Sequence, residues 1–308
     1  MPELPEVETI RRGLRPRVRG RVVEEVVIGR SRVLRSDPEE LMGTLSGQPL
    51  EEVRRRGKNL LFDFPGHCLL VHLGMTGQLT FRDPGKPDSD GFVRHETTGL
   101  QRTRQHPPDK HTHLQFLFRD GTAMLYRDIR QFGKIYLYSS RSPQLQAYLD
   151  GLGLEPFTDE YRLEDFVAGL KGRKVAVKSI LLDQGFVAGV GNIYADEALF
   201  EARLNPLRPV SGLKKAEKER LFQAVPLVLE RGIHFGGTSL RDYIDSEGRQ
   251  GNHQEELKVY GRDGQPCRTC GEVIEKIVVS QRGTHFCPGC QGRYRPRKRA
   301  SSRKRKKA

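Results

Sequence analysis

Two pairs of cysteines near the C-terminus restrict the fold more than any other feature of this sequence. Two residues separate Cys267 from Cys270, two separate Cys287 from Cys290, and sixteen lie between the pairs. Each pair can present two thiolates from one tight turn, and two pairs complete a tetrahedral four-sulfur site. Because four protein ligands leave no open position, the spacing predicts one structural Zn²⁺, with an iron site or two disulfides as alternatives.

A β-hairpin is expected between the two cysteine pairs. Residues 277–280 and 284–286 suit two short strands, and residues 281–283 suit the turn between them. The metal would therefore hold Arg282 at a rigid tip. Cys68 stands alone within an apolar run, which predicts a buried core thiol.

The positive charge of the chain is concentrated at its C-terminal end. Lys and Arg number 53 against 39 Asp and Glu, a formal net charge of +14. Ten of the basic residues lie within residues 292–308, which hold no acid, so 43 basic residues face 39 acidic ones elsewhere. Such a tail is predicted to be disordered, and it either aids DNA binding through counterion release or only keeps the protein soluble.

No segment predicts membrane insertion or export. No run approaches the ~20 apolar residues of a membrane span, and none resembles a signal peptide. We therefore expect a soluble protein of the cytoplasm, where thiols stay reduced and clustered cysteines favour metal over disulfides.

The hydrophobic pattern changes along the chain and predicts several units. A helix over residues 5–18 and short β-rich runs up to residue 138 predict a β-sandwich with a flanking helix. Helical spacing follows at residues 144–149, 163–170, 171–184, 193–204 and 214–233, with a kink or break expected at Pro226. The predicted units are residues 1–138, a linker at 139–143, a helical domain at 144–262, the zinc module at 263–291 and the tail at 292–308. Residues 82–110 are predicted to form a long mobile loop.

The N-terminal run MPELPEVE offers a reactive amine. Removal of Met1 would leave the secondary amine of Pro2 as the N-terminus. An α-amino group ionises near pH ~8, so more of it is neutral than of a lysine, and neutral amines form imines. Glu3 lies beside it and could move protons. The alternative is an ordinary helix start, with proline and acids in the first turn.

A second candidate site lies in the helical half. Lys171, Arg173 and Lys174 are expected to open a helix, with Lys178 one turn later, and Gly189-Val190-Gly191-Asn192 leads into the next helix. Free amides at a helix start and nearby cations suit a phosphate group. An ordinary joint between helices, with Asn192 as a cap, is the alternative.

Several segments together resemble the bacterial formamidopyrimidine-DNA glycosylase family, whose members remove oxidised purines from DNA. They are PELPEVET at residues 2–9, RRRGKNLL around Lys58, HLGMTG at 72–77, GVGNIYADEALF at 189–200, and the CRTCG and QRGTHFCPGC runs at the cysteine pairs. The resemblance covers residues 1–291. It implies an α+β fold: an N-terminal β-sandwich with a flanking helix, and a C-terminal helix-two-turn-helix domain with a zinc-bound β-hairpin. The helical domain would also carry a lesion-recognition loop.

The resemblance also implies roles for individual residues. Pro2 would attack C1′ of the damaged nucleotide to give an iminium, and Glu3 would donate the proton that opens the sugar. Lys58 and Arg282 would donate protons linked to β- and δ-elimination. Family members flip the damaged base out of the duplex. The positions that match wedge and DNA-contact residues of the family are Met75, His111, Arg130, Phe132, Arg173 and Asn192.

Two departures separate this chain from the family pattern. The loop at residues 82–110 is longer, and Ile129 and Gln131 stand where the family typically carries Pro and Arg. The implied activity is a bifunctional DNA glycosylase and AP lyase of base excision repair that acts on double-stranded damaged DNA. The implied protein is a monomer without a membrane partner or small-molecule cofactor, associated with the bacterial nucleoid through DNA.

Two other functions are compatible with parts of the sequence. An endonuclease VIII-like enzyme of the same fold would prefer oxidised pyrimidines, but Leu4, the Met75, Arg130 and Phe132 trio, and the long loop at 236–264 favour the purine enzyme. A non-catalytic zinc protein that binds DNA would require a blocked Pro2. His111 and His113 alternate along a strand and could form a metal pair, although four cysteines already supply a full ligand set.

Overall fold

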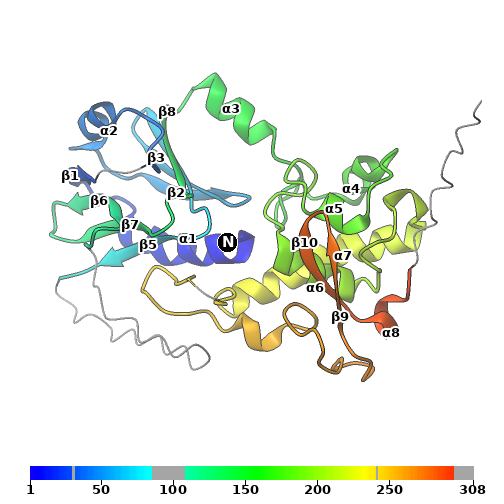
Figure 1. The fold of residues 1–308 in the computed structure, drawn as a ribbon. Helices are drawn as coiled ribbons and strands as arrows, with labels where there is room; N and C mark the ends of the chain where they lie inside the picture. Colours follow the sequence, from blue (N-terminus) through cyan, green and yellow to red (C-terminus); the bar gives the residue numbers. More distant parts are fainter. Residues whose placement is uncertain (30–31, 85–107, 241, 295–308) are drawn as a thin grey trace, which may run out of the picture.

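The computed structural model describes residues 1–29, 32–84, 108–240 and 242–294. It shows a β-rich N-terminal half and a helical C-terminal half, with the long helices of the two halves packed together (Figure 1). Most of the predicted loop at 82–110, and the predicted disordered tail beyond residue 294, lie outside the described residues.

The N-terminal half is a sandwich of two antiparallel four-stranded sheets. One sheet has the order β1-β6-β7-β5 and the other β2-β3-β4-β8. Apolar side chains such as Phe62, Phe116 and Tyr126 face the space between the sheets and are almost fully buried. The strands are β1 (Val23–Ile28), β2 (Glu52–Arg56), β3 (Asn59–Phe64), β4 (His67–His72), β5 (Gly77–Arg82), β6 (Thr112–Phe118), β7 (Ala123–Asp128) and β8 (Lys134–Ser139). The predicted sandwich is confirmed.

Helix α1 (Leu4–Val18) joins the two halves. Val7, Ile10 and Leu14 recur at helical spacing and are buried in the sandwich core. Leu4, at the first position, instead packs into the core of the helical half. Its backbone N–H donates to the carbonyl of Gly189 at 3.0 Å. The start of α1 is therefore fixed by contacts on both sides. A second short helix, α2 (Pro38–Leu45), covers β1.

The C-terminal half consists of short helices around one long helix. They are α4 (Leu163–Leu170), α5 (Val177–Leu181), α6 (Asn192–Glu201), the 3₁₀ turn η1 (Val210–Gly212), α7 (Lys215–His234) and the 3₁₀ turn η2 (His253–Glu256). Helix α3 (Pro143–Asp150) precedes them and packs through Leu145 against Leu61 and Leu70 of the sandwich. Only α5 is helical within the predicted helix at 171–184, and Ala176 directly before it instead forms a β-bridge with Pro209. Helix α7 continues through Pro226, so the chain does not break there. Among the described residues, no helix combines the length and apolar character needed to cross a bilayer.

The loop after α7 folds back onto the N-terminal sandwich. Tyr243 is buried in the sandwich core, although it belongs to the C-terminal half of the sequence. The Gln78 side chain donates to the carbonyl of Asp242 at 2.7 Å, and the Phe81 N–H donates to the carbonyl of Ser246 at 2.9 Å. This loop therefore connects the two halves a second time.

The zinc module forms the predicted hairpin. Strands β9 (Glu275–Val279) and β10 (Arg282–Phe286) are antiparallel, and α8 (Pro288–Gln291) follows. Ser280 and Gln281 form the two-residue turn and both have positive φ, 50° and 59°, as the tightest hairpin turns require. Arg282 is thus the first residue of β10, opposite Val279, beside the turn rather than at its centre.

Candidate active site and DNA interface

The four predicted metal ligands converge at the base of the hairpin. The sulfur atoms of Cys267, Cys270, Cys287 and Cys290 all lie within 4.8 Å of one another. Backbone N–H groups of Thr269 and Cys290 donate to the sulfurs of Cys267 and Cys287 at 3.4 Å, as is usual for thiolates in a zinc knuckle. All five cysteines of the described chain are free thiols, which argues against the disulfide alternative. This set of four sulfur ligands fits a tetrahedral zinc ion that stabilises the fold and takes no part in catalysis.

The hairpin is anchored to the helical domain by a buried polar network. The ammonium of Lys178, in α5, donates to Thr284 Oγ1 at 2.8 Å and to the carbonyl of Gly283 at 3.2 Å. The side-chain amide of Asn192 donates to the same carbonyl at 2.9 Å. The sequence grouped Lys178 with Lys171 and Lys174 as a possible phosphate ligand. Its buried contacts show instead that Lys178 is not a surface phosphate ligand. Together these contacts fix the backbone beside Arg282, whose side chain is exposed.

Glu3 lies at the start of helix α6 rather than in solvent. Its carboxylate accepts backbone N–H groups of Gly191 at 2.7 Å, Ile193 at 3.0 Å and Tyr194 at 3.4 Å. A carboxylate is stabilised there by free amides and the positive end of the helix dipole. A Cβ at Gly191 would overlap the Glu3 carboxylate, so only a glycine at this position leaves room for that side chain. Glu3 and the buried Pro2 therefore sit between the two halves of the protein.

Glu6 is a second buried carboxyl beside Glu3, and no motif in the sequence predicts a role for it. It accepts the N–H of Glu3 at 2.7 Å, the hydroxyl of Tyr194 at 2.8 Å and the N–H of Thr238 at 2.8 Å. Burial, with a contribution from the Glu3 charge, raises the pKa of Glu6 to about 7. Glu6 thus ties the peptide after Pro2 to helix α6 and to the loop that follows α7.

Lys58 lies in the turn between β2 and β3 and is almost fully buried, 7% exposed. Burial lowers the pKa of its ammonium, while the charges of Glu3 and Glu6 act in the opposite direction and Arg282 adds to the lowering. These electrostatic contributions place Lys58 in the same surroundings as three other charged groups: Glu3 and Glu6 at the start of α1, and Arg282 of β10. The structure thus brings predicted catalytic residues together across the two halves.

Glu155 holds the turn that carries Lys58. Its carboxylate accepts the N–H of Gly57 at 2.7 Å and the Arg56 guanidinium at 2.9 Å, and it also pairs with Arg55. Gly57 has φ +55°, and a Cβ there would press against Ala188. The turn between β2 and β3 is therefore held in place by Glu155 and Ala188, which follow the sandwich in the sequence.

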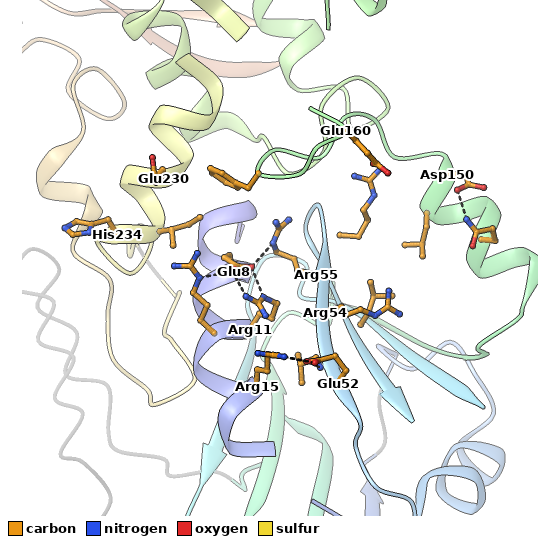
Figure 2. Close-up of a pocket in the computed structure, with 18 residues that line it drawn as sticks. Glu8, Arg11, Arg15, Glu52, Arg54, Arg55, Asp150, Glu160, Glu230 and His234 are labelled. Carbon is orange, nitrogen blue, oxygen red and sulfur yellow. Dashed lines mark hydrogen bonds and ion pairs between the residues drawn. The ribbon is translucent and has the colours of Figure 1, made fainter. Parts of the chain in front are cut away.

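A pocket of about 980 Å³ lies between α1, β2 and the segments around Glu160 and Glu230 (Figure 2). Its arginines already have partners: Arg11 pairs with Glu8, and Arg15 with Glu52. None of the predicted catalytic or DNA-contact residues lines it. The pocket is a groove at the junction of the halves, and it is not the predicted active site.

The three predicted wedge residues are exposed at neighbouring loops of the sandwich. Met75 is 39% exposed and Phe132 is 51% exposed, high values for side chains of this type. The Arg130 guanidinium lies over the Phe132 ring, 4.6 Å from its centre. Gln131 between them has φ 52°, and its Oε1 accepts the N–H of Arg32 at 3.1 Å, so it points back to the protein.

The remaining predicted DNA-contact residues are at least partly accessible. Arg173 is exposed and pairs with Asp183 at 3.0 Å, and Asn192 is half-buried at the first turn of α6. His111 is half-buried, whereas His113 is buried and its Nε2 donates to the carbonyl of Asp128 at 2.8 Å. His113 thus has a structural partner, and the cysteine set is the only cluster of three or more possible metal ligands within the described residues.

Three sequence profiles match the chain in the order of its structural units. They are the formamidopyrimidine-DNA glycosylase N-terminal domain at residues 1–135, the glycosylase H2TH (helix-two-turn-helix) domain at 152–243 and a zinc finger found in FPG and IleRS at 264–293. Together with the fold and the cysteine site, they define a DNA glycosylase with a structural zinc finger.

Individual relatives narrow the class to one family. The formamidopyrimidine-DNA glycosylases of Enterococcus faecalis and Lactobacillus delbrueckii are 40% and 41% identical, over 94% and 95% of this chain and 97% and 100% of theirs. Lactococcus lactis Fpg in complex with abasic-site DNA has a TM-score of 0.81, at 33% identity over 94% of this chain and 100% of that chain. Its complex with Fapy-dG DNA has a TM-score of 0.80, at 32% identity over 94% and 100%. The chain belongs to the formamidopyrimidine-DNA glycosylase family of base excision repair.

Proposed function

We propose that this glycosylase excises oxidised purines, 8-oxoguanine and formamidopyrimidines, from double-stranded DNA and then cuts the strand by β,δ-elimination. The observation that carries the proposal is the clasp of the Glu3 carboxylate by the amides of Gly191, Ile193 and Tyr194, directly beside Pro2. The solved complexes of Lactococcus lactis Fpg with Fapy-dG and abasic-site DNA support this substrate class.

The proposed nucleophile is the nitrogen of Pro2 after removal of Met1. Its lone pair forms a bond to C1′, and its N–H proton passes to the Glu3 carboxylate. The bond from C1′ to the ring oxygen breaks, and Glu3 donates that proton to the ring oxygen. The base leaves with the electron pair of the glycosidic bond and takes up a proton. The resulting iminium withdraws electrons from C1′, so that a 2′ hydrogen can be lost as a proton.

Strand cleavage would follow from the iminium. Loss of the 2′ proton drives departure of the 3′ phosphate, and a second elimination releases the 5′ phosphate. We assign Lys58 to proton transfer in the first elimination and Arg282 to proton transfer in the second. The lowered pKa of Lys58 supports this role, since it brings the group nearer to exchange of a proton at neutral pH.

The damaged base would lie outside the helix during these steps. Met75, Arg130 and Phe132 are proposed to fill the vacated stack, as their exposure permits. His111, Arg173 and Asn192 are proposed to contact the DNA backbone. We further expect a monomer that works on chromosomal DNA in the cytoplasm, with no cofactor other than zinc.

Competing substrates test the assignment to purines. Single-turnover excision of 8-oxoguanine opposite cytosine should be faster than excision of thymine glycol from a duplex of the same sequence. The reverse order would assign the chain to the pyrimidine-preferring branch of the fold. An undamaged duplex of the same sequence serves as the control.

A further inference from the structure

We infer that Asp128 is the positioning residue for the base-eviction wedge: its buried carboxylate ties together the two loops that present Met75, Arg130 and Phe132. This inference rests on the proposed wedge role of those three side chains. Asp128 itself does not reach the surface and would not contact DNA, since it is 0% exposed.

The Asp128 carboxylate is satisfied by hydrogen-bond donors from both loops. Oδ1 accepts the hydroxyl of Thr76 at 2.5 Å and the N–H of Arg130 at 3.2 Å. Oδ2 accepts the N–H of Gly133 at 2.8 Å and the hydroxyl of Tyr126 at 3.3 Å. Within the described residues it forms no ion pair, so these donors alone stabilise a buried carboxylate, which is costly without them.

Three of these four donors are a wedge residue or stand next to one in the sequence, and the fourth, Tyr126, lies in β7. Thr76 follows Met75, the Arg130 amide is that of a wedge residue itself, and Gly133 follows Phe132. Thr76 Oγ1 also accepts the Arg130 N–H at 3.1 Å, which links the two loops directly. A single carboxylate therefore holds a residue at or next to each of the three wedge positions.

The surrounding backbone leaves these loops little room to adjust. Asp128 ends β7 and is paired with Gly77 of β5, and its own carbonyl is held by His113. A Cβ at Gly74 would overlap the backbone of Phe132, and a Cβ at Gly133 would overlap the hydroxyl of Tyr126. The two loops thus pack backbone against backbone over the Asp128 side chain.

The segment that follows Asp128 has no residue that restricts its own backbone. Ile129 follows Asp128, and an isoleucine does not restrict φ as a proline ring would. Gln131 has a positive φ of 52°, a conformation that is unfavourable for a residue with a side chain. The hydrogen bonds of Asp128 therefore supply order that the local sequence does not.

If the loops that carry the wedge residues are already ordered before DNA binding, no conformational entropy is lost in ordering them when the wedge enters the base stack. Loss of the Asp128 charge should therefore slow eviction of a stacked base and spare the chemistry at a site with no base. Asp128→Asn should lower single-turnover release of 8-oxoguanine paired with cytosine by about tenfold or more. It should change nicking of a preformed abasic site opposite cytosine by less than about threefold.

Two further variants keep the test decisive if Asp128→Asn folds poorly. Thr76→Val removes one hydroxyl from the network and should give a smaller loss of the same selective kind, whereas Thr76→Ser should restore the wild-type rates. Asp120→Asn is the matched control, because Asp120 caps the β6–β7 turn through Thr122 and touches no wedge loop.

Phe132→Ala separates the inference from the proposal beneath it. If Phe132→Ala does not slow release of the paired base, the wedge assignment itself fails. If Phe132→Ala slows it but Asp128→Asn and Thr76→Val leave it unchanged, or slow both substrates equally, Asp128 does not position the wedge.

Discussion

Lys178 and Asp196 form an ion pair of 2.7 Å in which both side chains are completely buried. Asp196 also accepts the N–H of His285 at 2.8 Å, and Lys178 donates to Thr284, so both members of the pair hold strand β10. The pair lies in the helical domain, but its position determines where the hairpin arginine, Arg282, is presented.

Removal of one member should therefore destabilise the protein strongly. Lys178→Met leaves the Asp196 charge buried without its cation, a change that typically costs about 3–5 kcal/mol. We expect a loss of this size in urea unfolding of the zinc-bound protein. Lys171→Met, at an exposed position, is the control, and an equal effect of the two substitutions would contradict a structural role for the pair.

Glu3→Gln should separate base release from strand cleavage. The amide cannot donate the proton that opens the sugar, so excision of 8-oxoguanine should fall by about 100-fold or more. A preformed abasic site exists partly as the open aldehyde, and its cleavage should fall much less. Gel assays with the two substrates measure both rates, and an equal loss on both would remove Glu3 from the proton-donor role.

The lowered pKa of Lys58 predicts the pH dependence of β-elimination. A proton donor must be protonated, so its contribution is lost as pH rises through its pKa. Because burial lowers this pKa, the rate on abasic sites should begin to fall below the ~10.4 of an ordinary lysine. Lys58→Arg keeps its charge and should move the fall to higher pH. If the pH–rate profiles of the wild type and Lys58→Arg coincide, another group causes the fall in rate at high pH.

Zinc removal should act on DNA binding and leave the sandwich folded. Cys287→Ser removes a buried ligand, so bound zinc should be lost and affinity for an abasic-site duplex should fall, because the hairpin would no longer be held. Atomic absorption and fluorescence anisotropy measure the two quantities. Cys68→Ala, in the core of the N-terminal half, should retain zinc. Unchanged DNA affinity in Cys287→Ser would show that the hairpin is dispensable.

The sequence predicted those parts of the fold in which local pattern and burial agree. Helix α1 and the cysteine hairpin were predicted from periodicity and spacing, and both are confirmed. Strand β2 has the sequence Glu-Val-Arg-Arg-Arg, which carries little apolar pattern. Arg55 and Arg56 are accommodated in it by Glu155, about 100 residues away. The helix predicted at 171–184 was too long: α5 spans only Val177–Leu181, and Ala176 before it pairs with Pro209.

The supporting residues of the site were harder to predict than its reactive ones. Pro2, Glu3 and Lys58 lie in segments that resemble a known family, and their roles remain predictions. Asp128 and Glu6 act through contacts with residues distant in sequence, such as Thr76 and Thr238, and no local spacing marks them. The sequence makes Lys178 a candidate phosphate ligand because it does not reveal that Asp196 lies opposite it in the interior.

Borohydride trapping tests the central claim most directly. Reduction during turnover on an 8-oxoguanine duplex should yield a covalent protein–DNA adduct, and peptide mapping should place the DNA on the nitrogen of Pro2 in protein that lacks Met1. Pro2→Gly should greatly weaken the trapped band. An adduct that maps to a lysine, or full activity in protein that retains Met1, would contradict the account.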